Sequence, residues 1–145
     1  MIDVKIKRLT PGAVLPTKAH EHDAGWDFYA PVDMETVTLW PGQRRTINAG
    51  ISVAIPVGWY LQIMSRSGLA SKSIDARAGV IDCTYRGEVG IILHNDGAWG
   101  GGYIVEPGAK IAQGVFLMVP EVSWEEVDTL DDTARGDGGY GSSGR

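Results

Sequence analysis

Turn-forming residues recur along the whole chain and divide it into short segments. Pro-Gly pairs stand at 11–12, 41–42 and 107–108, and Asp-x-Gly or Asn-x-Gly triplets stand at 23–25, 48–50 and 95–97. Glycine accounts for 20 of the 145 residues, which is about twice its average share. Because glycine and proline favour turns and interrupt helices, this spacing excludes a bundle of long helices. It predicts many short elements that are joined by tight turns.

The segments between these turns are rich in β-branched and aromatic residues, which favour strands. Within 51–53 and 61–63 apolar and polar residues alternate strictly, as expected of a strand that is buried on one face. We therefore expect an all-β sandwich or barrel-like domain. The clearest expected strands are 51–55, 59–63, 89–93, 103–105 and 115–119.

One helix is expected, at 67–74. Ser67 is a suitable N-cap, and Leu69, Ala70 and Ile74 can face inward. The three residues 66–68, Arg-Ser-Gly, stand where this helix begins, and two interpretations are open. They form a phosphate site at a helix N-terminus, or they form an ordinary capped helix with a surface arginine.

The length predicts one domain, which we place at residues 1–130. The last fifteen residues, 131–145, contain five glycines and no aliphatic side chain larger than alanine. Two interpretations of this glycine-rich arm are open. It is a frayed end, or it is an arm that becomes ordered over a ligand through its backbone N–H groups and Arg135.

Charge and cysteine content narrow the class of partner. A formal net charge of −5 disfavours nonspecific nucleic-acid binding. The longest apolar run, 115–119, is far shorter than the ~20 residues of a membrane-spanning helix. With Cys83 as the only cysteine, the chain has no internal disulfide framework, so we expect a cytoplasmic protein. From the net charge and the short apolar run, we expect neither a nucleic-acid nor a membrane partner.

Residues 79–90 predict a hairpin, with glycines at both ends and Asp82 and Tyr85 near its bend. A carboxylate that directly follows two aliphatic residues is unfavourable unless it has a partner or a task. Asp82 is therefore a candidate functional carboxylate, although an aspartate that caps its own turn is an ordinary alternative. His20 and His22 are either metal ligands or part of a solvated polar loop.

Five segments, taken in order, resemble the motifs of the trimeric dUTPase family (deoxyuridine triphosphate nucleotidohydrolases). They are AGWDFYA (24–30), SRSGLA (65–70), GVIDCTYRGEVGIILHN (79–95), PGAKIAQ (107–113) and ARGDGGYGSSG (134–144). The chain departs from the family pattern at a few positions. Phe28 replaces leucine, Thr84 replaces an acidic residue, Ala109-Lys110 replaces an Asp-Arg pair, and Tyr140 replaces phenylalanine.

The resemblance implies a distorted jelly-roll or β-clip domain with one short helix. It implies a homotrimer whose sites are shared between subunits and closed by a flexible C-terminal arm. It also implies hydrolysis of dUTP to dUMP and pyrophosphate with Mg²⁺, through attack of water on the α-phosphate. That activity keeps uracil out of DNA and supplies dUMP for dTMP synthesis.

The resemblance also implies roles for individual residues. Asp82 would bind the 3′-hydroxyl and activate the attacking water, Gln113 would position phosphate and water, and Asp27 would act on the magnesium shell through water. No residue is expected to ligate the metal directly. Substrate binding is expected from Arg66, Ser67 and Gly68 at the phosphates, from Gly79, Val80, Ile81 and Gly90 at uracil, from Tyr85 under the deoxyribose, and from Arg135, Tyr140, Gly141, Ser142 and Ser143 in the arm.

Two alternatives remain open at this point. The first is a dCTP deaminase-related nucleotide enzyme, which would need a glutamate base near the pyrimidine. The second is a regulatory binding protein that keeps the nucleotide site as a sensor.

Overall fold

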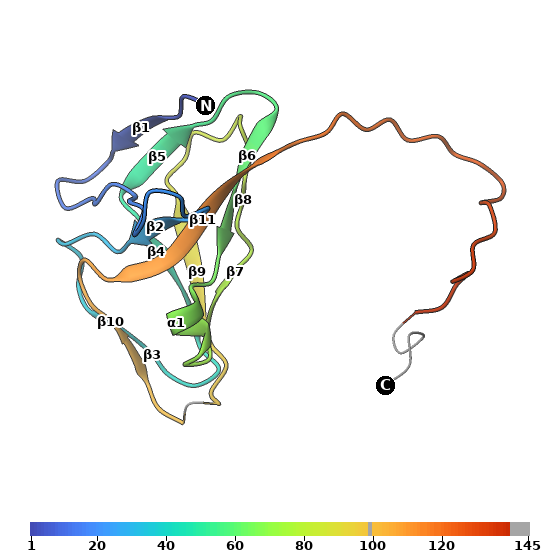
Figure 1. The fold of residues 1–145 in the computed structure, drawn as a ribbon. Helices are drawn as coiled ribbons and strands as arrows, with labels where there is room; N and C mark the ends of the chain where they lie inside the picture. Colours follow the sequence, from blue (N-terminus) through green and yellow to red (C-terminus); the bar gives the residue numbers. More distant parts are fainter. Residues whose placement is uncertain (99, 140–145) are drawn as a thin grey trace.

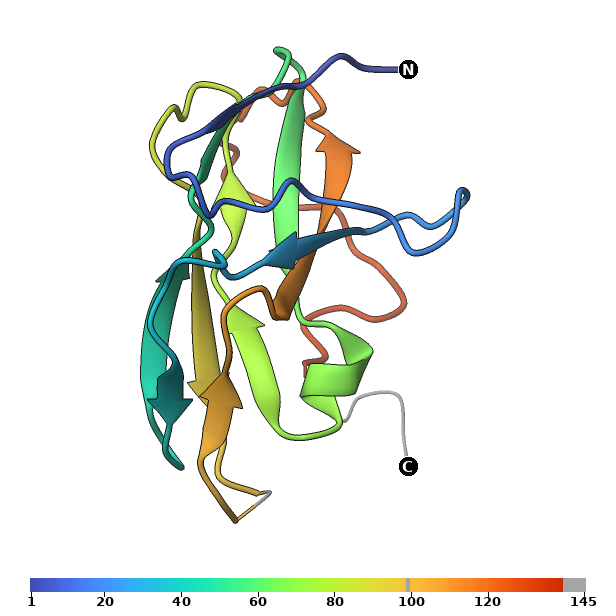
Figure 2. The ribbon, with the colours of Figure 1, turned by 90° about the vertical axis from the view of Figure 1, so that its left-hand side faces the viewer.

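The computed structural model describes residues 1–98 and 100–139. Within them the chain is nearly all β with one short helix, as expected (Figure 1, Figure 2). The strands are β1 (Lys5–Arg8), β2 (Trp26–Tyr29), β3 (Val37–Leu39), β4 (Arg44–Asn48), β5 (Ile51–Ala54), β6 (Trp59–Met64), β7 (Ile74–Arg77), β8 (Val80–Ile81), β9 (Gly90–Asn95), β10 (Tyr103–Val105) and β11 (Lys110–Met118); α1 spans Ser67–Ala70.

The described strands form four antiparallel groups. A four-stranded sheet has the order β2-β11-β6-β8, a three-stranded sheet has the order β4-β9-β7, and β1-β5 and β3-β10 form two pairs. The nine-residue β11 lies inside the four-stranded sheet, where Gln113 is the partner of Asp27 on one side and of Met64 on the other. Sheet pairing therefore brings the first, second and fourth motif segments to one place.

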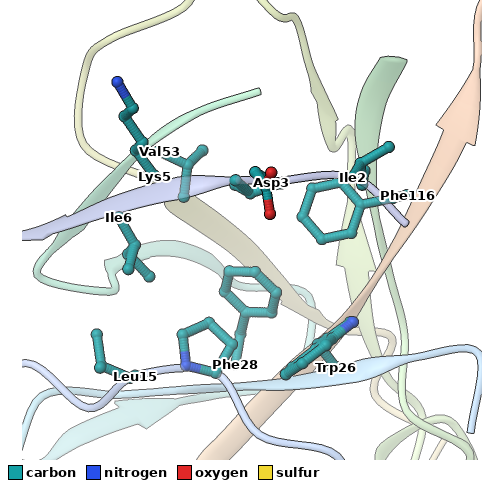
Figure 3. Close-up of a pocket in the computed structure, with 11 residues that line it drawn as sticks. Ile2, Asp3, Lys5, Ile6, Leu15, Trp26, Phe28, Val53 and Phe116 are labelled. Carbon is teal, nitrogen blue, oxygen red and sulfur yellow. The ribbon is translucent and has the colours of Figure 1, made fainter. Parts of the chain in front are cut away.

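The two faces of the four-stranded sheet have different chemistry. Phe28 and Phe116 point to one face, where they line an apolar cavity of about 430 Å³ together with Ile6 and Trp26 (Figure 3). Asp27 and Gln113 alternate with these residues along β2 and β11, so they point to the opposite face.

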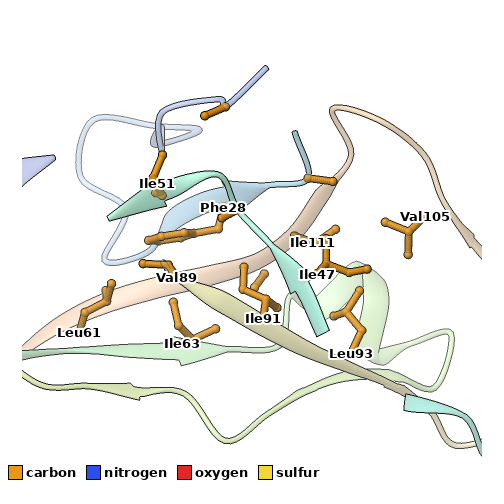
Figure 4. Close-up of a cluster of buried hydrophobic side chains, with 14 of the residues drawn as sticks. Phe28, Ile47, Ile51, Leu61, Ile63, Val89, Ile91, Leu93, Val105 and Ile111 are labelled. Carbon is orange, nitrogen blue, oxygen red and sulfur yellow. The ribbon is translucent and has the colours of Figure 1, made fainter. Parts of the chain in front are cut away.

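The hydrophobic core lies between the sheets (Figure 4). Ile51 and Val53 in β5, and Leu61 and Ile63 in β6, are buried while the residue between each pair is not, which confirms the alternation seen in the sequence. Each fully buried aliphatic side chain contributes about 1.5–3 kcal/mol relative to an exposed one. The core includes Phe28, Ile51, Leu61, Ile63, Val89, Ile91, Leu93, Val105 and Ile111.

The expected strand at 115–119 begins earlier, at Lys110. Gly114, just before the expected start, lies inside the strand. A Cβ atom there would lie 2.6 Å from the Phe28 ring and 2.8 Å from Leu61 Cδ1. Glycine is needed at this position because the core packs directly against the backbone.

The expected helix at 67–74 is wrong in length and in its cap. The helix ends at Ala70, and Arg66 is the N-cap residue, with no side-chain capping hydrogen bond. Ser73 has a φ of 59°, in the left-handed region, where the chain turns into β7. Ile74 is the first residue of β7 and is buried there, so tertiary packing overrides the helical spacing.

The expected hairpin at 79–90 is also wrong in its pairing. Val80–Ile81 pairs with β6, whereas β9 has β4 on one side and β7 on the other. The two expected strands of the hairpin therefore belong to different sheets, and residues 82–89 form the loop that connects them. The turn itself is present, since the Tyr85 N–H donates to the Asp82 carbonyl at 3.0 Å.

After β11 the chain leaves the body of the molecule as an extended segment (Figure 1). The Val119 N–H donates to the Gly58 carbonyl at 2.9 Å, and residues 119–137 are all exposed. Among the residues that the structure describes, no helix is long and apolar enough to cross a membrane.

Candidate functional site

A polar cavity of about 380 Å³ opens on the Asp27 face of the four-stranded sheet. Four of the expected site residues line this cavity: Asp27, Arg66, Ser67 and Gln113. Arg66 Nε lies 2.9 Å from Asp27 Oδ1, and the side chain of Asp27 is only 12% exposed. The rest of the lining is Ala19, Asp23, Ala24 and Gly25.

Gln113 is held in this cavity by two contacts. Its Nε2 donates to the Ser65 carbonyl at 3.0 Å, and its Oε1 lies 2.7 Å from the position that a Cβ of Gly25 would take. The side-chain amide is therefore fixed between the first and second motif segments. Gly68, in the first turn of α1, has open space around the position of its missing Cβ. This leaves room for a ligand beside Arg66 and Ser67.

Lys110 also belongs to this group, although sequence reasoning assigned it no role. Its Nζ lies 2.7 Å from Asp27 Oδ2. That hydrogen bond raises the pKa of Lys110 above its ordinary value, against a smaller opposing effect of burial. Two cations, Arg66 and Lys110, thus share the Asp27 carboxylate. The sequence feature that could have drawn attention to Lys110 is the Ala109-Lys110 pair, which replaces the Asp-Arg pair of the family pattern.

A second cavity, of about 330 Å³, holds the other expected residues. Val80, Ile81 and Gly90 line it together with Asp82 and Tyr85, and β4 and the connecting loop supply Thr46, Asn48 and Glu88. The Tyr85 hydroxyl donates to the Glu88 carbonyl at 3.0 Å, which fixes the ring over the loop. Gly87 lies directly under this ring, since a Cβ there would lie 2.3 Å from the hydroxyl oxygen.

Glycines border this second cavity because its walls approach closely. Gly79 has a φ of +112°, and a Cβ there would lie 2.7 Å from the Ile63 carbonyl oxygen. A Cβ on Gly90 would lie 3.0 Å from Thr46 Cγ2 and 3.3 Å from Asn48 Oδ1. Larger residues at either position would displace backbone or fill the cavity.

The two cavities have no lining residue in common. Ile81 pairs with Leu61 on β6, and Arg66 follows five positions further along the chain. At about 3.3 Å per residue, Arg66 lies about 16 Å along the sheet from the position of Ile81, and Asp82 lies one residue further away. A single chain therefore does not bring Asp82 to the residues around Arg66.

Arg135 lies on the extended segment, where its Nε donates to the Gly138 carbonyl at 3.0 Å. It does not line either cavity. The expected arm residues Tyr140, Gly141, Ser142 and Ser143 lie outside the described residues.

His20 and His22 are exposed in a turn that is closed by Asp23, whose Oδ2 accepts from the His20 N–H at 2.9 Å. Across residues 1–98 and 100–139, no group of three or more His, Cys, Asp or Glu side chains is arranged to hold a metal ion.

Comparison with known proteins identifies a family over nearly the whole chain. A family model described as dUTPase matches residues 12–144. A deoxyuridine 5′-triphosphate nucleotidohydrolase of Anaplasma marginale is 41% identical over 149 residues, with 99% of each chain covered. A protein of the same name from Syntrophotalea carbinolica is 43% identical, with 99% of this chain and 97% of that protein covered.

Solved structures give the same result for the fold. A variant of the dUTPase of Staphylococcus bacteriophage 80alpha, solved with dUpNHpp, aligns with a TM-score of 0.88 at 29% identity, covering 99% of both chains. A dUTPase variant from phage phi11 of S. aureus, described with a structural Mg(II) ion, aligns with a TM-score of 0.79 at 26% identity, covering 88% of this chain and 98% of that one.

Proposed function

Since this chain belongs to the dUTPase family, we propose that it hydrolyses dUTP to dUMP and pyrophosphate. The observation that carries the proposal is the complementary chemistry of the two cavities. One presents the Arg66 guanidinium and the Gln113 amide, which suit a triphosphate, and the other presents the Asp82 carboxylate beside the Tyr85 ring.

Arg66, Ser67 and Gly68 bind the phosphates in this proposal. A guanidinium group forms charge-assisted hydrogen bonds to phosphate oxygens, and the open space at Gly68 lets the phosphate approach the backbone. Gln113, held by Ser65, orients the phosphate and the attacking water. Phosphoryl transfer requires mainly such positioning and charge neutralisation from the protein.

The backbone of Gly79, Val80, Ile81 and Gly90 reads uracil in the second cavity. Cytosine would place its amino donor against a backbone donor, and the unpaired group would cost roughly 1–3 kcal/mol. The methyl group of thymine would have to displace backbone, and overpacking of this kind costs about 1–3 kcal/mol. Tyr85 packs under the deoxyribose and leaves no room for a 2′-hydroxyl.

Asp82 accepts a proton from the attacking water. The water oxygen forms a bond to the α-phosphorus, and the bond between that phosphorus and the α,β-bridging oxygen breaks. The electron pair leaves with pyrophosphate. Positioned general bases contribute about 100- to 10,000-fold to the rate of such steps.

Magnesium belongs to the proposal as the counterion of the triphosphate. Mg²⁺ binds through one or two carboxylates together with substrate phosphates and water. Asp27 fits this description as a carboxylate on the cavity wall, although Arg66 and Lys110 each occupy one of its oxygens. Its remaining lone pairs suit a magnesium-bound water better than the ion itself. The ion supplies neutralisation of phosphate charge.

The separation of the two cavities supports a shared site. A general base must lie within hydrogen-bond reach of its water, yet Asp82 and Arg66 of one chain are more than about 16 Å apart along the sheet. We assign the carboxylate and the phosphate cavity of each site to different copies of the chain, in a homotrimer with closed symmetry.

The arm 131–145 closes over the bound nucleotide, with Arg135 near the phosphates and Tyr140, Gly141, Ser142 and Ser143 around the base and phosphates. Support comes from the exposure of residues 119–137 and from the sequence of the arm, which has no aliphatic side chain larger than alanine. Closure would exclude water other than the attacking one.

Neither alternative from the sequence is favoured, because the full-length relatives are nucleotidohydrolases. The test is to incubate the protein with magnesium and, separately, dUTP, dTTP, dCTP or UTP, and to measure pyrophosphate and ammonia. We expect pyrophosphate from dUTP at a rate far above that from the other three. Ammonia from dCTP, or equal turnover of all four, would contradict the proposal.

A further inference from the structure

Lys110 is a cation beside the phosphate cavity, bound to Asp27 of its wall, that the proposed reaction does not use. Its Nζ lies 2.7 Å from Asp27 Oδ2, and its side chain is 38% exposed. The hydrogen bond to Asp27 raises the pKa of Lys110, so the ammonium stays charged at neutral pH. An ion pair with this much exposure contributes little to the stability of the fold. We therefore expect its main effect to be on the phosphate cavity.

A β-bulge turns Lys110 to the face of the sheet on which the phosphate cavity opens. In the pairing with β2, Lys110 is opposite Tyr29, Ala112 is opposite Phe28, and Gln113 is opposite Asp27, with a register shift between Lys110 and Ala112. Regular alternation would put residues 110 and 113 on opposite faces of the sheet. The extra residue, the buried Ile111, puts both on the Asp27 face. Bulges commonly re-aim side chains in this way beside active sites.

Asp27 divides its two oxygens between two cations. Arg66 uses Nε for Oδ1, at 2.9 Å, and Lys110 uses Nζ for Oδ2. Arg66 Nη1 makes only a long contact of 3.4 Å to the Lys110 carbonyl, and Nη2 makes no hydrogen bond within the part of the chain that the structure describes. The terminal edge of the guanidinium therefore remains largely available to a ligand.

An arginine beside a carboxylate with two free oxygens tends to form a bidentate pair. If Lys110 did not occupy Oδ2, Arg66 could turn a second N–H towards Asp27, and its terminal nitrogens would rotate away from the cavity. Removing the ammonium would also leave Arg66 as the only cation on the Asp27 carboxylate, so the positive charge beside the cavity would fall by one.

We infer that Lys110 is a positioning residue: by occupying one oxygen of Asp27 it keeps the terminal nitrogens of Arg66 directed at the triphosphate. The inference rests on the proposed function. Lys110 acts through Asp27 and need not contact the substrate itself.

The test compares Lys110→Met, which removes the charge and keeps most of the stem, with Lys110→Arg, which keeps a cation. Steady-state hydrolysis of dUTP is measured with magnesium in excess. For Lys110→Met we expect KM to rise about tenfold or more while kcat changes less than about threefold, because the lost interaction acts on binding. Lys110→Arg should restore KM to near the wild-type value. Lys7→Met, on the exposed β1, is the matched control.

A double variant separates positioning from direct contact. In the Asp27→Asn background Lys110→Met should produce no further rise in KM, because the carboxylate through which it acts is gone. Binding of dUMP, which lacks the β- and γ-phosphates, should be weakened less by Lys110→Met than binding of dUpNHpp.

Three outcomes would overturn the inference: a KM for Lys110→Met within about twofold of wild type, equal impairment of the Met and Arg variants, or additive effects with Asp27→Asn. Failure of the wild-type protein to release pyrophosphate from dUTP would instead contradict the proposed function, so the two failures are distinguishable.

Discussion

Gln113 faces Asp27 across the pairing of β2 and β11, and both side chains enter the same polar cavity. The register of two strands thus decides which residues meet at the phosphate site. Gly25, two residues before Asp27, lies against the Gln113 amide and completes this wall.

Replacing Gly25 with alanine should lower activity without unfolding the protein. The new Cβ would lie 2.7 Å from Gln113 Oε1, so the amide must move. A displacement of about 1 Å at a positioning group can cost about 100-fold in rate. We expect kcat for dUTP hydrolysis to fall by roughly tenfold or more. Thermal unfolding should change little. The control is Gly101→Ala, where nothing lies within 4 Å of the new Cβ; equal activity of the two variants would contradict this role of Gly25.

Tyr85 should discriminate against ribonucleotides through its ring. Tyr85→Phe loses the hydrogen bond to the Glu88 carbonyl but keeps the ring, so preference for dUTP over UTP should persist. Tyr85→Ala should reduce that preference by about tenfold or more, since the space for a 2′-hydroxyl opens. The measurement is the ratio of kcat/KM for the two substrates. An unchanged ratio in Tyr85→Ala would assign the discrimination to another residue.

A chain that ends at Ala134 should fold normally and lose most of its activity. Residues 119–137 are exposed, and the segment 135–145 contains no aliphatic side chain, so we expect the core to remain intact without it. We expect the same circular dichroism spectrum and Tm as the full chain, with dUTP turnover reduced about 100-fold. Full activity would show that the arm is dispensable, and an unfolded product would show that it belongs to the core.

The Lys110–Asp27 pair should affect stability in a pH-dependent way. The hydrogen bond to Asp27 raises the pKa of Lys110 above 10.5, so the folded state holds this proton more tightly than the unfolded chain. The contribution to stability is therefore complete below the unfolded pKa and is lost as pH rises through the folded one. In urea unfolding, the difference between wild type and Lys110→Met should be constant from about pH 7 to about pH 10 and shrink above that. A difference that persists at higher pH would exclude the ammonium as its source.

The sequence predicted the strands where turn signals and alternation agree, as in β5 and β6. It did not predict that Gly114 continues β11, because the need for glycine there arises from Phe28 and Leu61, which are distant in sequence. The length of α1 was overestimated because Ile74 is buried in β7 and not on a helix.

The site residues were found through motif resemblance, but their grouping was not. Lys110 joins Asp27 only because of a bulge, and the separation of Asp82 from Arg66 follows from the pairing of β8 with β6. Both the contact and the separation depend on the register in which the strands pair, and this register cannot be read from single residues.

Mixing two inactive variants tests the shared site most directly. Asp82→Asn and Arg66→Met chains are each expected to lose about 100-fold or more in turnover. If each site takes its carboxylate and its phosphate cavity from different copies, unfolding and refolding an equal mixture should restore about a quarter of the wild-type dUTP turnover, because that fraction of sites combines two intact halves. A refolded mixture that stays as inactive as the separate variants would contradict a shared site.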